Sequence, residues 1–304
     1  VGTDNGVYLF DRERKTFRRG DSPFGLWTLS DPTVHAMMWD NEGTLWVMTN
    51  SGGINYMSKQ SKRFSTYSLS LTGMEKADRG IGPFCEDREK NVWVGTRNGL
   101  WFFNSQTHSF YEYSLKKSNI RYDVRSLLLE GDNLWVGTFS KGVKVVDTRT
   151  GAIVKTYQKT DSPRSLIDNS VFSICCTTTG DIYLGTLFGL LRYNKQSDDF
   201  DRIPELNGRF VYDIKEDSGG NLWLATYANG AYCYNVSEKK WKNYLHDKNN
   251  PKSLPYDKVL SIFEDSHRQI WLTTQGGGFC RFQPDTETFA NYNLSAGLPN
   301  DVVY

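Results

Sequence analysis

Near its C-terminus the chain reads Ile270-Trp271-Leu272-Thr273-Thr274-Gln275-Gly276-Gly277, a short apolar segment followed by a glycine turn. An aromatic residue or valine shortly before a threonine occurs seven times in this way, with the threonines 40 to 48 residues apart. The copies are Val1-Gly2-Thr3, Trp46-Val47-Met48-Thr49, Trp93-Val94-Gly95-Thr96, Trp135-Val136-Gly137-Thr138, Tyr183-Leu184-Gly185-Thr186, Trp223-Leu224-Ala225-Thr226 and Trp271-Leu272-Thr273-Thr274. A period of this length, in units that read as strands, is typical of β-propeller blades.

The unit from Asp257 to Tyr292 contains four strand-like segments separated by polar turns. We expect strands at residues 259–265, 270–274, 278–282 and 288–292, which short turns would join into an antiparallel meander. One such sheet cannot bury both faces, whereas sheets packed around an axis can. The sequence therefore predicts an all-β fold: a seven-bladed β-propeller of four-stranded antiparallel blades, with almost no helix.

The two ends of the chain bear on blade 1. Val1 stands at the second strand of its unit, whereas residues 298–304 have the pattern of a first strand. All-β domains of this length are often single units. We expect residues 1–304 to form one propeller domain, with blade 1 closed by strand 298–304 or with that strand opening a further blade. A chain that starts in the middle of a repeat is expected to be a fragment of a larger protein.

The repeated tryptophans and glycines have structural roles in this interpretation. Trp93, Trp135, Trp223 and Trp271 are predicted to fill the space between adjacent sheets. Glycine follows the second strand because the tight turn requires a residue that tolerates positive φ, as in Asn98-Gly99.

Composition argues against several classes of partner. The 36 basic and 35 acidic residues give a net charge of +1 without a basic run, so nucleic acid is not expected as a partner. No run of 18 apolar residues occurs, so this segment is not expected to insert into a membrane. The five cysteines lie in strand-like segments without metal-ligand spacing, and we predict free, buried thiols, no metal and no cofactor.

One unit carries a recognisable motif. The sequence Glu216-Asp217-Ser218-Gly219-Gly220-Asn221-Leu222-Trp223-Leu224-Ala225-Thr226 resembles the two-component-regulator propeller repeat. The linkers Asp161-Ser162-Pro163-Arg164-Ser165-Leu166 and Asn250-Pro251-Lys252-Ser253-Leu254-Pro255 resemble it as well. The resemblance implies the periplasmic sensor region of a hybrid two-component system, a receptor that binds oligosaccharides and regulates polysaccharide-utilisation genes through a histidine kinase. It also implies a second propeller of the same receptor as a partner.

Catalytic signatures are absent from the sequence. It contains no Gly-x-Ser-x-Gly elbow, His-Glu-x-x-His pair or phosphate loop. The acidic pairs Glu86-Asp87, Glu216-Asp217 and Glu264-Asp265 occupy the same turn of their units, which favours turn chemistry over a glycosidase pair. We therefore predict that this chain is not an enzyme and has no catalytic residues.

A binding site is expected where the repeat loses its symmetry. The turns after the second strands and the linkers into the first strands should emerge at one end of the blades, where recognition residues gather. Aromatic rings and planar donors that vary between blades suit a sugar. The candidate ligand-binding residues are Arg97, Asn98, Arg121, Phe139, Phe188, Arg209, Tyr227, Asn229, Tyr256 and Gln275.

Three functions stay open on the sequence. The first is a carbohydrate-binding sensor module. The second is a non-catalytic platform for protein docking or homodimer formation, with the ligand bound elsewhere in the larger protein. The third is a polysaccharide-cleaving propeller enzyme.

Overall fold

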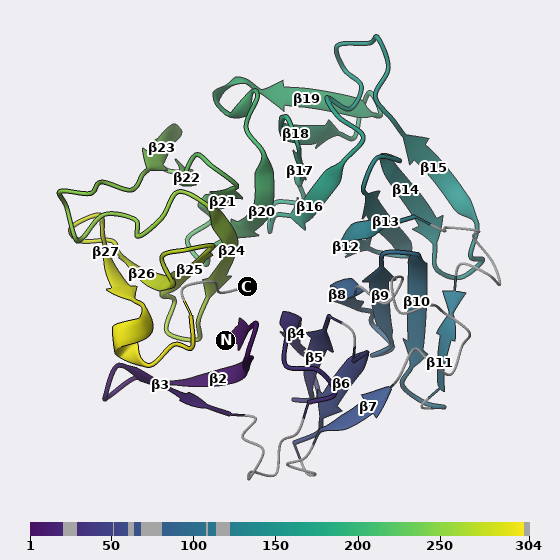
Figure 1. Ribbon diagram of the computed structural model, residues 1–304. Helices are drawn as coiled ribbons and strands as arrows, with labels where there is room; N and C mark the ends of the chain where they lie inside the picture. Colours follow the sequence, from purple (N-terminus) through teal and green to yellow (C-terminus); the bar gives the residue numbers. More distant parts are fainter. Residues whose placement is uncertain are drawn as a thin grey trace. The chain divides into compact units, whose positions relative to one another are not determined.

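The computed structural model describes residues 1–20, 29–50, 52–59, 64–67, 81–107, 109–113 and 122–300. Their strands form seven sheets in which consecutive strands pair, so each sheet is an antiparallel meander (Figure 1). The predicted seven-bladed β-propeller is confirmed, with three strands in blade 1 and four in each of the others. Helix is nearly absent, and the two helical elements described in full are the 3-10 turns η4 (Pro204–Leu206) and η5 (Leu294–Ala296).

The chain divides into two compact units. The first comprises Val1–Phe139 and Lys144–Thr156, and the second comprises Ser140–Val143 and Tyr157–Tyr304. Blades 1 to 3 and most of blade 4 belong to the first unit, and blades 5 to 7 to the second. The organisation of residues 1–304 as one domain stays a prediction. Closure of blade 1 by strand 298–304 concerns residues 301–304, which lie outside the described part of the chain.

In the first unit, the sheets follow the chain in order. Blade 1 contains β1 (Gly2–Thr3), β2 (Gly6–Asp11) and β3 (Thr16–Arg19), and blade 2 contains β4 (Val34–Trp39), β5 (Leu45–Thr49), β6 (Ile54–Met57) and β7 (Ser65–Tyr67). Blade 3 contains β8 (Ile81–Glu86), β9 (Val92–Thr96), β10 (Gly99–Asn104) and β11 (Ser109–Glu112), and blade 4 contains β12 (Val124–Glu130), β13 (Asn133–Thr138), β14 (Val143–Asp147) and β15 (Ile153–Tyr157).

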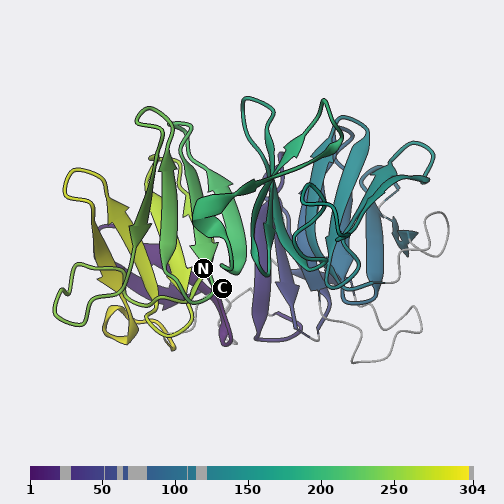
Figure 2. The same ribbon diagram turned by 90° about the horizontal axis from the view of Figure 1, so that it is seen from above.

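The second unit, drawn in green to yellow in Figure 2, repeats the arrangement. Blade 5 contains β16 (Val171–Cys176), β17 (Ile182–Thr186), β18 (Gly189–Asn194) and β19 (Asp199–Ile203). Blade 6 contains β20 (Val211–Glu216), β21 (Leu222–Thr226), β22 (Ala231–Asn235) and β23 (Lys240–Tyr244), and blade 7 contains β24 (Val259–Glu264), β25 (Ile270–Thr274), β26 (Phe279–Gln283) and β27 (Thr288–Tyr292). The strands predicted for residues 257–292 agree with these bounds to within one residue.

The repeated tryptophan is buried, and in four blades its indole N–H is hydrogen-bonded to an aspartate. Trp93, Trp223 and Trp271 are 1%, 3% and 4% exposed. In blades 2, 3, 6 and 7 an aspartate six residues earlier accepts the indole N–H, through the pairs Asp40–Trp46 (2.9 Å), Asp87–Trp93 (3.3 Å), Asp217–Trp223 (2.9 Å) and Asp265–Trp271 (2.8 Å). The Trp residue thus packs between sheets without losing the hydrogen bond of its one polar atom.

The same aspartates close the turn between the first and second strands. The other oxygen of Asp217 accepts the backbone N–H groups of Gly219 and Asn221, at 2.9 and 2.8 Å. Asp265 makes the equivalent contacts with His267 and Gln269, at 2.8 and 3.0 Å. The prediction that the acidic pairs serve turn chemistry is therefore confirmed for their aspartates.

The glutamate of each pair reaches a different target, which the sequence did not reveal. Glu86 accepts the backbone N–H of Asn41, and Glu264 accepts that of Ser218 at 3.0 Å. Each acceptor therefore binds the turn of the preceding blade. Glu216 does the same with Thr178, at 2.6 Å. Neighbouring blades of one unit are thus joined by a carboxylate as well as by apolar packing.

Blade 5 shows what replaces the aspartate. It has Tyr183 instead of tryptophan, so no indole N–H requires an acceptor, and Thr177 stands where the aspartate would be. The Thr177 hydroxyl accepts the backbone N–H of Asp181 at 3.0 Å, and the backbone N–H of Thr177 donates to the Asp181 carbonyl at 2.8 Å, so the turn closes without an aspartate. The two departures from the repeat compensate each other.

The repeated threonine and glycine form the turn at the opposite end of the second strand. The Thr226 hydroxyl donates to the carbonyl of Gly230 at 2.7 Å, and Thr226 is fully buried. Gly230 has φ of +70°, and a Cβ there would lie 2.0 Å from the carbonyl oxygen of Tyr244. Only glycine satisfies both constraints without a shift of the backbone.

We predict that Trp93→Ala and Trp223→Ala each lower the free energy of unfolding by about 3–5 kcal/mol, the usual cost of removing a large core aromatic. Chemical denaturation of the purified protein measures this loss. A loss below about 1 kcal/mol at both positions would show that the tryptophan is not a core residue.

Candidate functional site

One end of the blades, which we call the loop face, brings the second-strand turns against the linkers. The backbone N–H of Tyr227, after β21, donates to the carbonyl of Phe210 in the linker at 3.1 Å. Gln275 and Phe139 donate in the same way to Lys258 and Asp123, at 2.9 and 2.8 Å. The turns and linkers of blades 4, 6 and 7 thus meet at one end of the blade, as the sequence predicted.

In the second unit, the loop face carries an aromatic cluster of four half-buried rings: Phe172, Phe210, Tyr212 and Tyr227. The ring centroids of Phe172 and Phe210 are 4.4 Å apart, and those of Phe210 and Tyr227 are 5.3 Å apart. Tyr212 stacks on both Phe172 and Tyr227, at 5.9 and 6.4 Å. The cluster spans blades 5 and 6 and combines apolar faces with two phenol groups.

Blade 7 adds a cation and a further ring beside this cluster. The Lys258 ammonium lies 4.8 Å from the centroid of the Tyr227 ring, an attractive cation–π geometry. Tyr256 is 40% exposed, and its ring lies over Gly276, where a Cβ would come within 3.3 Å. The side-chain oxygen Oε1 of Gln275 is buried without a hydrogen-bond partner in the described structure. Lys258 thus contacts both Tyr227 and Gln275, and the ring of Tyr256 lies over Gly276, the residue after Gln275.

The remaining candidates of this unit lie around the same turns. Phe188 is 49% exposed and its carbonyl accepts the N–H of Gly208, next to the exposed Arg209. Asn229 is half-buried in the turn that Thr226 caps, with its backbone N–H 3.0 Å from the threonine hydroxyl. The ring contacts that form the aromatic cluster do not include these side chains.

The candidates in the first unit form smaller groups. Phe139 is 45% exposed, and the Arg125 guanidinium lies 5.7 Å from its ring centroid while bonding Asp123 at 2.6 Å. Arg97 is exposed and Asn98 half-buried in the turn between β9 and β10. Arg121 lies outside the described residues.

The sequence did not single out four residues of this site: Phe172, Phe210, Tyr212 and Lys258. Phe172 and Tyr212 are second residues of first strands, where β16 and β20 each show a register shift against the second strand. The signal was available in the sequence, because His35, Arg125, Phe172, Tyr212 and Leu260 at this strand position differ widely among blades.

Asp213, the residue after Tyr212 in β20, is a further departure from the repeat. The equivalent residue is serine in three other blades, Ser126, Ser173 and Ser261. Asp213 accepts the N–H of its neighbour Ile214 at 2.8 Å and that of Ile262 in blade 7 at 2.9 Å. Loss of hydration in this position raises the pKa of the Asp213 carboxyl from 3.8 to about 6, despite the two backbone donors that favour the anion.

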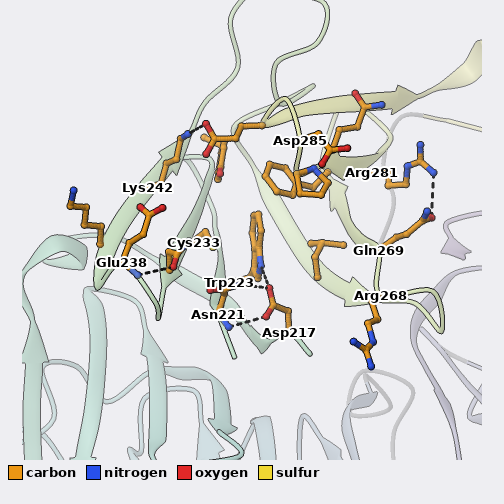
Figure 3. A pocket seen from close by; sticks show the side chains of 18 of the residues that line it. Asp217, Asn221, Trp223, Cys233, Glu238, Lys242, Arg268, Gln269, Arg281 and Asp285 are labelled. Atoms are coloured by element: carbon orange, nitrogen blue, oxygen red, sulfur yellow. Dashed lines mark hydrogen bonds and ion pairs between the residues drawn. The ribbon is translucent and has the colours of Figure 1, made fainter. Parts of the chain in front are cut away.

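A cavity of about 710 Å³ lies between blades 6 and 7, at the end of the sheets opposite the loop face (Figure 3). Trp223, Tyr244 and Phe282 form its aromatic wall, with Trp223 and Phe282 centroids 4.9 Å apart. Lys242 and Glu287 form an ion pair across it. None of the ten candidate residues lines this cavity, and part of its lining, Asp217 with Trp223, belongs to the turn motif of the fold.

The cysteines are free thiols in the structure. Cys233 and Cys280 are buried, and burial raises the pKa of the Cys233 thiol to about 12 and that of the Cys85 thiol to about 11. Raised pKa values oppose thiolate formation, which both nucleophilic and metal-binding cysteines require. Within the described ranges no three His, Cys, Asp or Glu residues are grouped to hold a metal ion. No helix in these ranges is long and apolar enough to cross a membrane.

Comparison with known proteins supports the resemblance of the repeat. A family model described as two component regulator propeller matches residues 28–51 and 205–228. The chain carries two-component regulator propeller repeats. A histidine kinase from Formosa agariphila, named histidine kinase P4, is 29% identical over 96% of this chain. The chain spans 22% of the length of that relative.

Solved structures resemble this chain in fold. The extracellular domain of a putative hybrid two-component system from B. thetaiotaomicron has a TM-score of 0.73 and 24% identity, with 94% of this chain and 37% of that chain covered. A virginiamycin B lyase from Staphylococcus aureus has a TM-score of 0.67 and 13% identity, with 94% and 87% covered. At these identities the likeness concerns the fold.

We predict a pH-dependent difference in stability between the protein and its Asp213→Asn variant. Between about pH 4 and pH 6 the folded state retains a proton that the unfolded chain releases, so the Asp213 contribution to stability falls as pH rises. Because the pKa of Asp213 is raised from 3.8 to about 6, its contribution to the free energy of unfolding falls by at most about 3 kcal/mol. Asparagine removes this contribution, so the variant should gain stability relative to the parent from pH 4 to pH 7.

Urea denaturation of both proteins at several pH values measures this difference. Other carboxyl groups affect both proteins alike and cancel in the comparison. Stability curves that stay parallel between pH 4 and pH 7 would refute the raised pKa.

Proposed function

We propose that this propeller is a non-catalytic recognition module of a larger two-component receptor, and that it binds an oligosaccharide at the aromatic cluster of its second unit. The observation that carries the proposal is the group of four rings, Phe172, Phe210, Tyr212 and Tyr227, beside the Lys258 ammonium. The family match and the histidine kinase relative favour a sensory role.

The chemistry of the cluster suits a sugar. Aromatic faces cover the apolar C–H surface of a pyranose ring, and rigid rings lose little conformational freedom on binding. The phenol groups of Tyr212 and Tyr227 can donate and accept hydrogen bonds, while Lys258 supplies donors for hydroxyl or carboxylate oxygens. The cluster therefore offers both parts of sugar recognition on elements of one unit.

In this proposal the propeller lies in the periplasm, outside the cytoplasmic membrane, and bound sugar controls a downstream kinase and genes for polysaccharide use. A ligand shifts a receptor between two states only through different affinity for them. Binding at a surface of exposed loops allows the ligand to contact a neighbouring domain as well, which would create that difference.

Docking of another domain, such as a second propeller of the receptor, is the second candidate function. It is favoured by the exposed apolar side chains of Phe188 and Tyr256 on the same face, 49% and 40% exposed. Exposed apolar groups that gather on one face often mark protein contacts.

The proposal predicts that Tyr227→Ala weakens oligosaccharide binding about tenfold or more, equivalent to at least about 1.4 kcal/mol. Isothermal titration calorimetry of this chain against neutral and acidic oligosaccharides identifies the ligand and measures the loss. Phe263→Ala is the control, because Phe263 is 59% exposed near the opposite end of β24 and should leave the affinity unchanged.

The outcomes separate the three functions. If an oligosaccharide binds to the parent protein and not to the folded Tyr227→Ala variant, the sensor module is supported. If no oligosaccharide binds, the docking function replaces it, and release of cleaved sugar during titration would establish an enzyme instead.

A further inference from the structure

Two linkers of the second unit fold over the outer edge of the blade that follows. In blade 5, the carbonyl of Arg164 accepts the backbone N–H of Phe200 on β19 at 2.9 Å. In blade 7, the carbonyl of Lys252 accepts the N–H of Phe289 on β27 at 2.7 Å. Leu166 and Leu254, which follow these contacts, are fully buried and anchor the linkers. The Ser-Pro-Arg-Ser-Leu and Asn-Pro-Lys-Ser-Leu-Pro motifs therefore pair with open edge strands.

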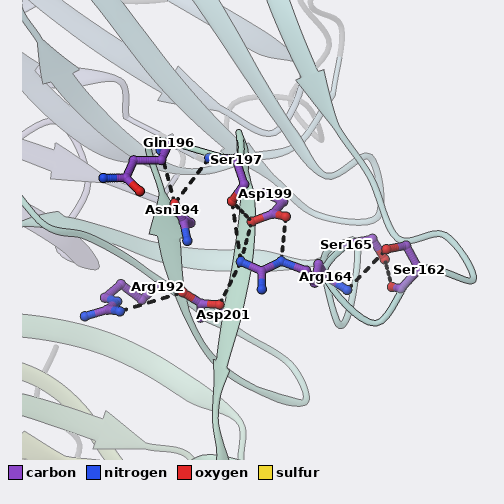
Figure 4. Close-up of polar contacts among 9 residues, drawn as sticks. All are labelled: Ser162, Arg164, Ser165, Arg192, Asn194, Gln196, Ser197, Asp199 and Asp201. Atoms are coloured by element: carbon purple, nitrogen blue, oxygen red, sulfur yellow. Dashed lines mark hydrogen bonds and ion pairs between the residues drawn. The ribbon is translucent and has the colours of Figure 1, made fainter.

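The blade 5 linker also carries a charge opposite to that of the edge strand β19 (Figure 4). Arg164 bonds Asp199 at 2.6 Å and Asp201 at 3.0 Å, both on β19. Arg192 on β18 lies 3.7 Å from Asp201 and continues the row of ion pairs. The edge of β19 thus holds the linker by one backbone hydrogen bond and by the positive charge of Arg164. That charge faces Asp199 and Asp201, which are two residues apart on the strand.

Blade 6 has a different linker. Residues 204–210 form η4 and a turn whose Gly208 donates to the carbonyl of Phe188, so this shorter linker stays on the loop face. In the described part of the chain, the backbone hydrogen bonds of β23 all go to its neighbour β22. The outer edge of β23 is therefore an open strand edge.

Register identifies the residues of β23 that correspond to the two covered edges. Trp241 pairs with Tyr234 as Phe200 pairs with Tyr193, so the Trp241 N–H takes the place of the Phe200 N–H. Lys240 and Lys242 then take the places of Asp199 and Asp201. Blade 6 thus offers the same donor with the charges of the two flanking residues reversed.

We propose that β23 binds an extended, acidic peptide segment of a partner protein as an added strand of blade 6. A carbonyl of the peptide accepts the Trp241 N–H, and its carboxylates face Lys240 and Lys242 across the strands, where opposite charges attract. A second copy of this chain is a poor occupant, because pairing β23 with β23 brings lysines together.

The surroundings of β23 leave room for such a segment. Lys240, Lys242 and Tyr244 also line the cavity between blades 6 and 7, so alternate side chains of the peptide reach its rim (Figure 3). The ion pair of Lys242 with Glu287 is about half-exposed and therefore contributes little, so a peptide carboxylate can replace it at small cost.

The test uses a fluorescent, end-capped peptide of alternating threonine and glutamate, with binding followed by fluorescence anisotropy at low salt. The probe should bind, and the same peptide with glutamine in place of glutamate should bind at least tenfold more weakly. Trp241→Pro removes the N–H donor from an outer strand edge, where proline is tolerated. This variant and the double variant Lys240→Glu/Lys242→Glu should each weaken binding at least tenfold. Lys248→Glu, at an exposed position of residues 245–258, is the control for net charge.

A peptide N-methylated at every residue separates strand addition from simple charge attraction. It keeps the carboxylates but cannot pair as a strand, so it should not bind. The inference is overturned if the unmodified probe does not bind, if the N-methylated peptide binds equally well, or if Trp241→Pro binds with unchanged affinity. Circular dichroism of each variant confirms that the sheets are intact.

Discussion

The hydrogen bond between an aspartate carboxylate and a tryptophan indole is the interaction on which the rest of this structure depends. A tryptophan between two sheets supplies a large apolar surface but carries one N–H that must find an acceptor when water is excluded. In blades 2, 3, 6 and 7 the acceptor is the aspartate six residues earlier, as in Asp217–Trp223. Because the same carboxylate closes the turn between the first two strands, core packing and turn geometry are coupled.

This coupling explains where the blades are free to differ. In blades 2, 3, 6 and 7 the Asp–Trp turn occupies one end of the sheet. The Thr–Gly turn occupies the other end without involving the side chain of the residue after the threonine. Tyr227 and Gln275 hold such positions, and their side chains are free to serve recognition. Asp213 and β23 depart from the repeat in another way. Asp213 puts a carboxyl group that contacts blade 7 next to Tyr212, and β23 has reversed charges on an open edge.

The sequence predicted the blades well because strand length, turn residues and the Trp–Thr spacing are local features that repeat. It placed Tyr227, Tyr256 and Gln275 on the correct end of the sheets for the same reason. It missed Phe172 and Tyr212, although residues at this strand position vary among blades, because the register shifts of β16 and β20 that set the direction of these side chains are visible only in the paired strands. The contacts of Glu264 with Ser218 and of Arg164 with Asp199 were equally hidden, since they join residues far apart in the chain.

A double-mutant cycle on Asp217 and Trp223 tests the central interaction most directly. Asp217→Ala, Trp223→Phe and the double variant are compared with the parent by chemical denaturation, and the cycle isolates the energy of the pair from the other losses. The account predicts a coupling energy of about 1–3 kcal/mol, as for hydrogen bonds that involve a charged group. A coupling energy within error of zero would contradict the account, because core and turn would then be stabilised independently of this bond.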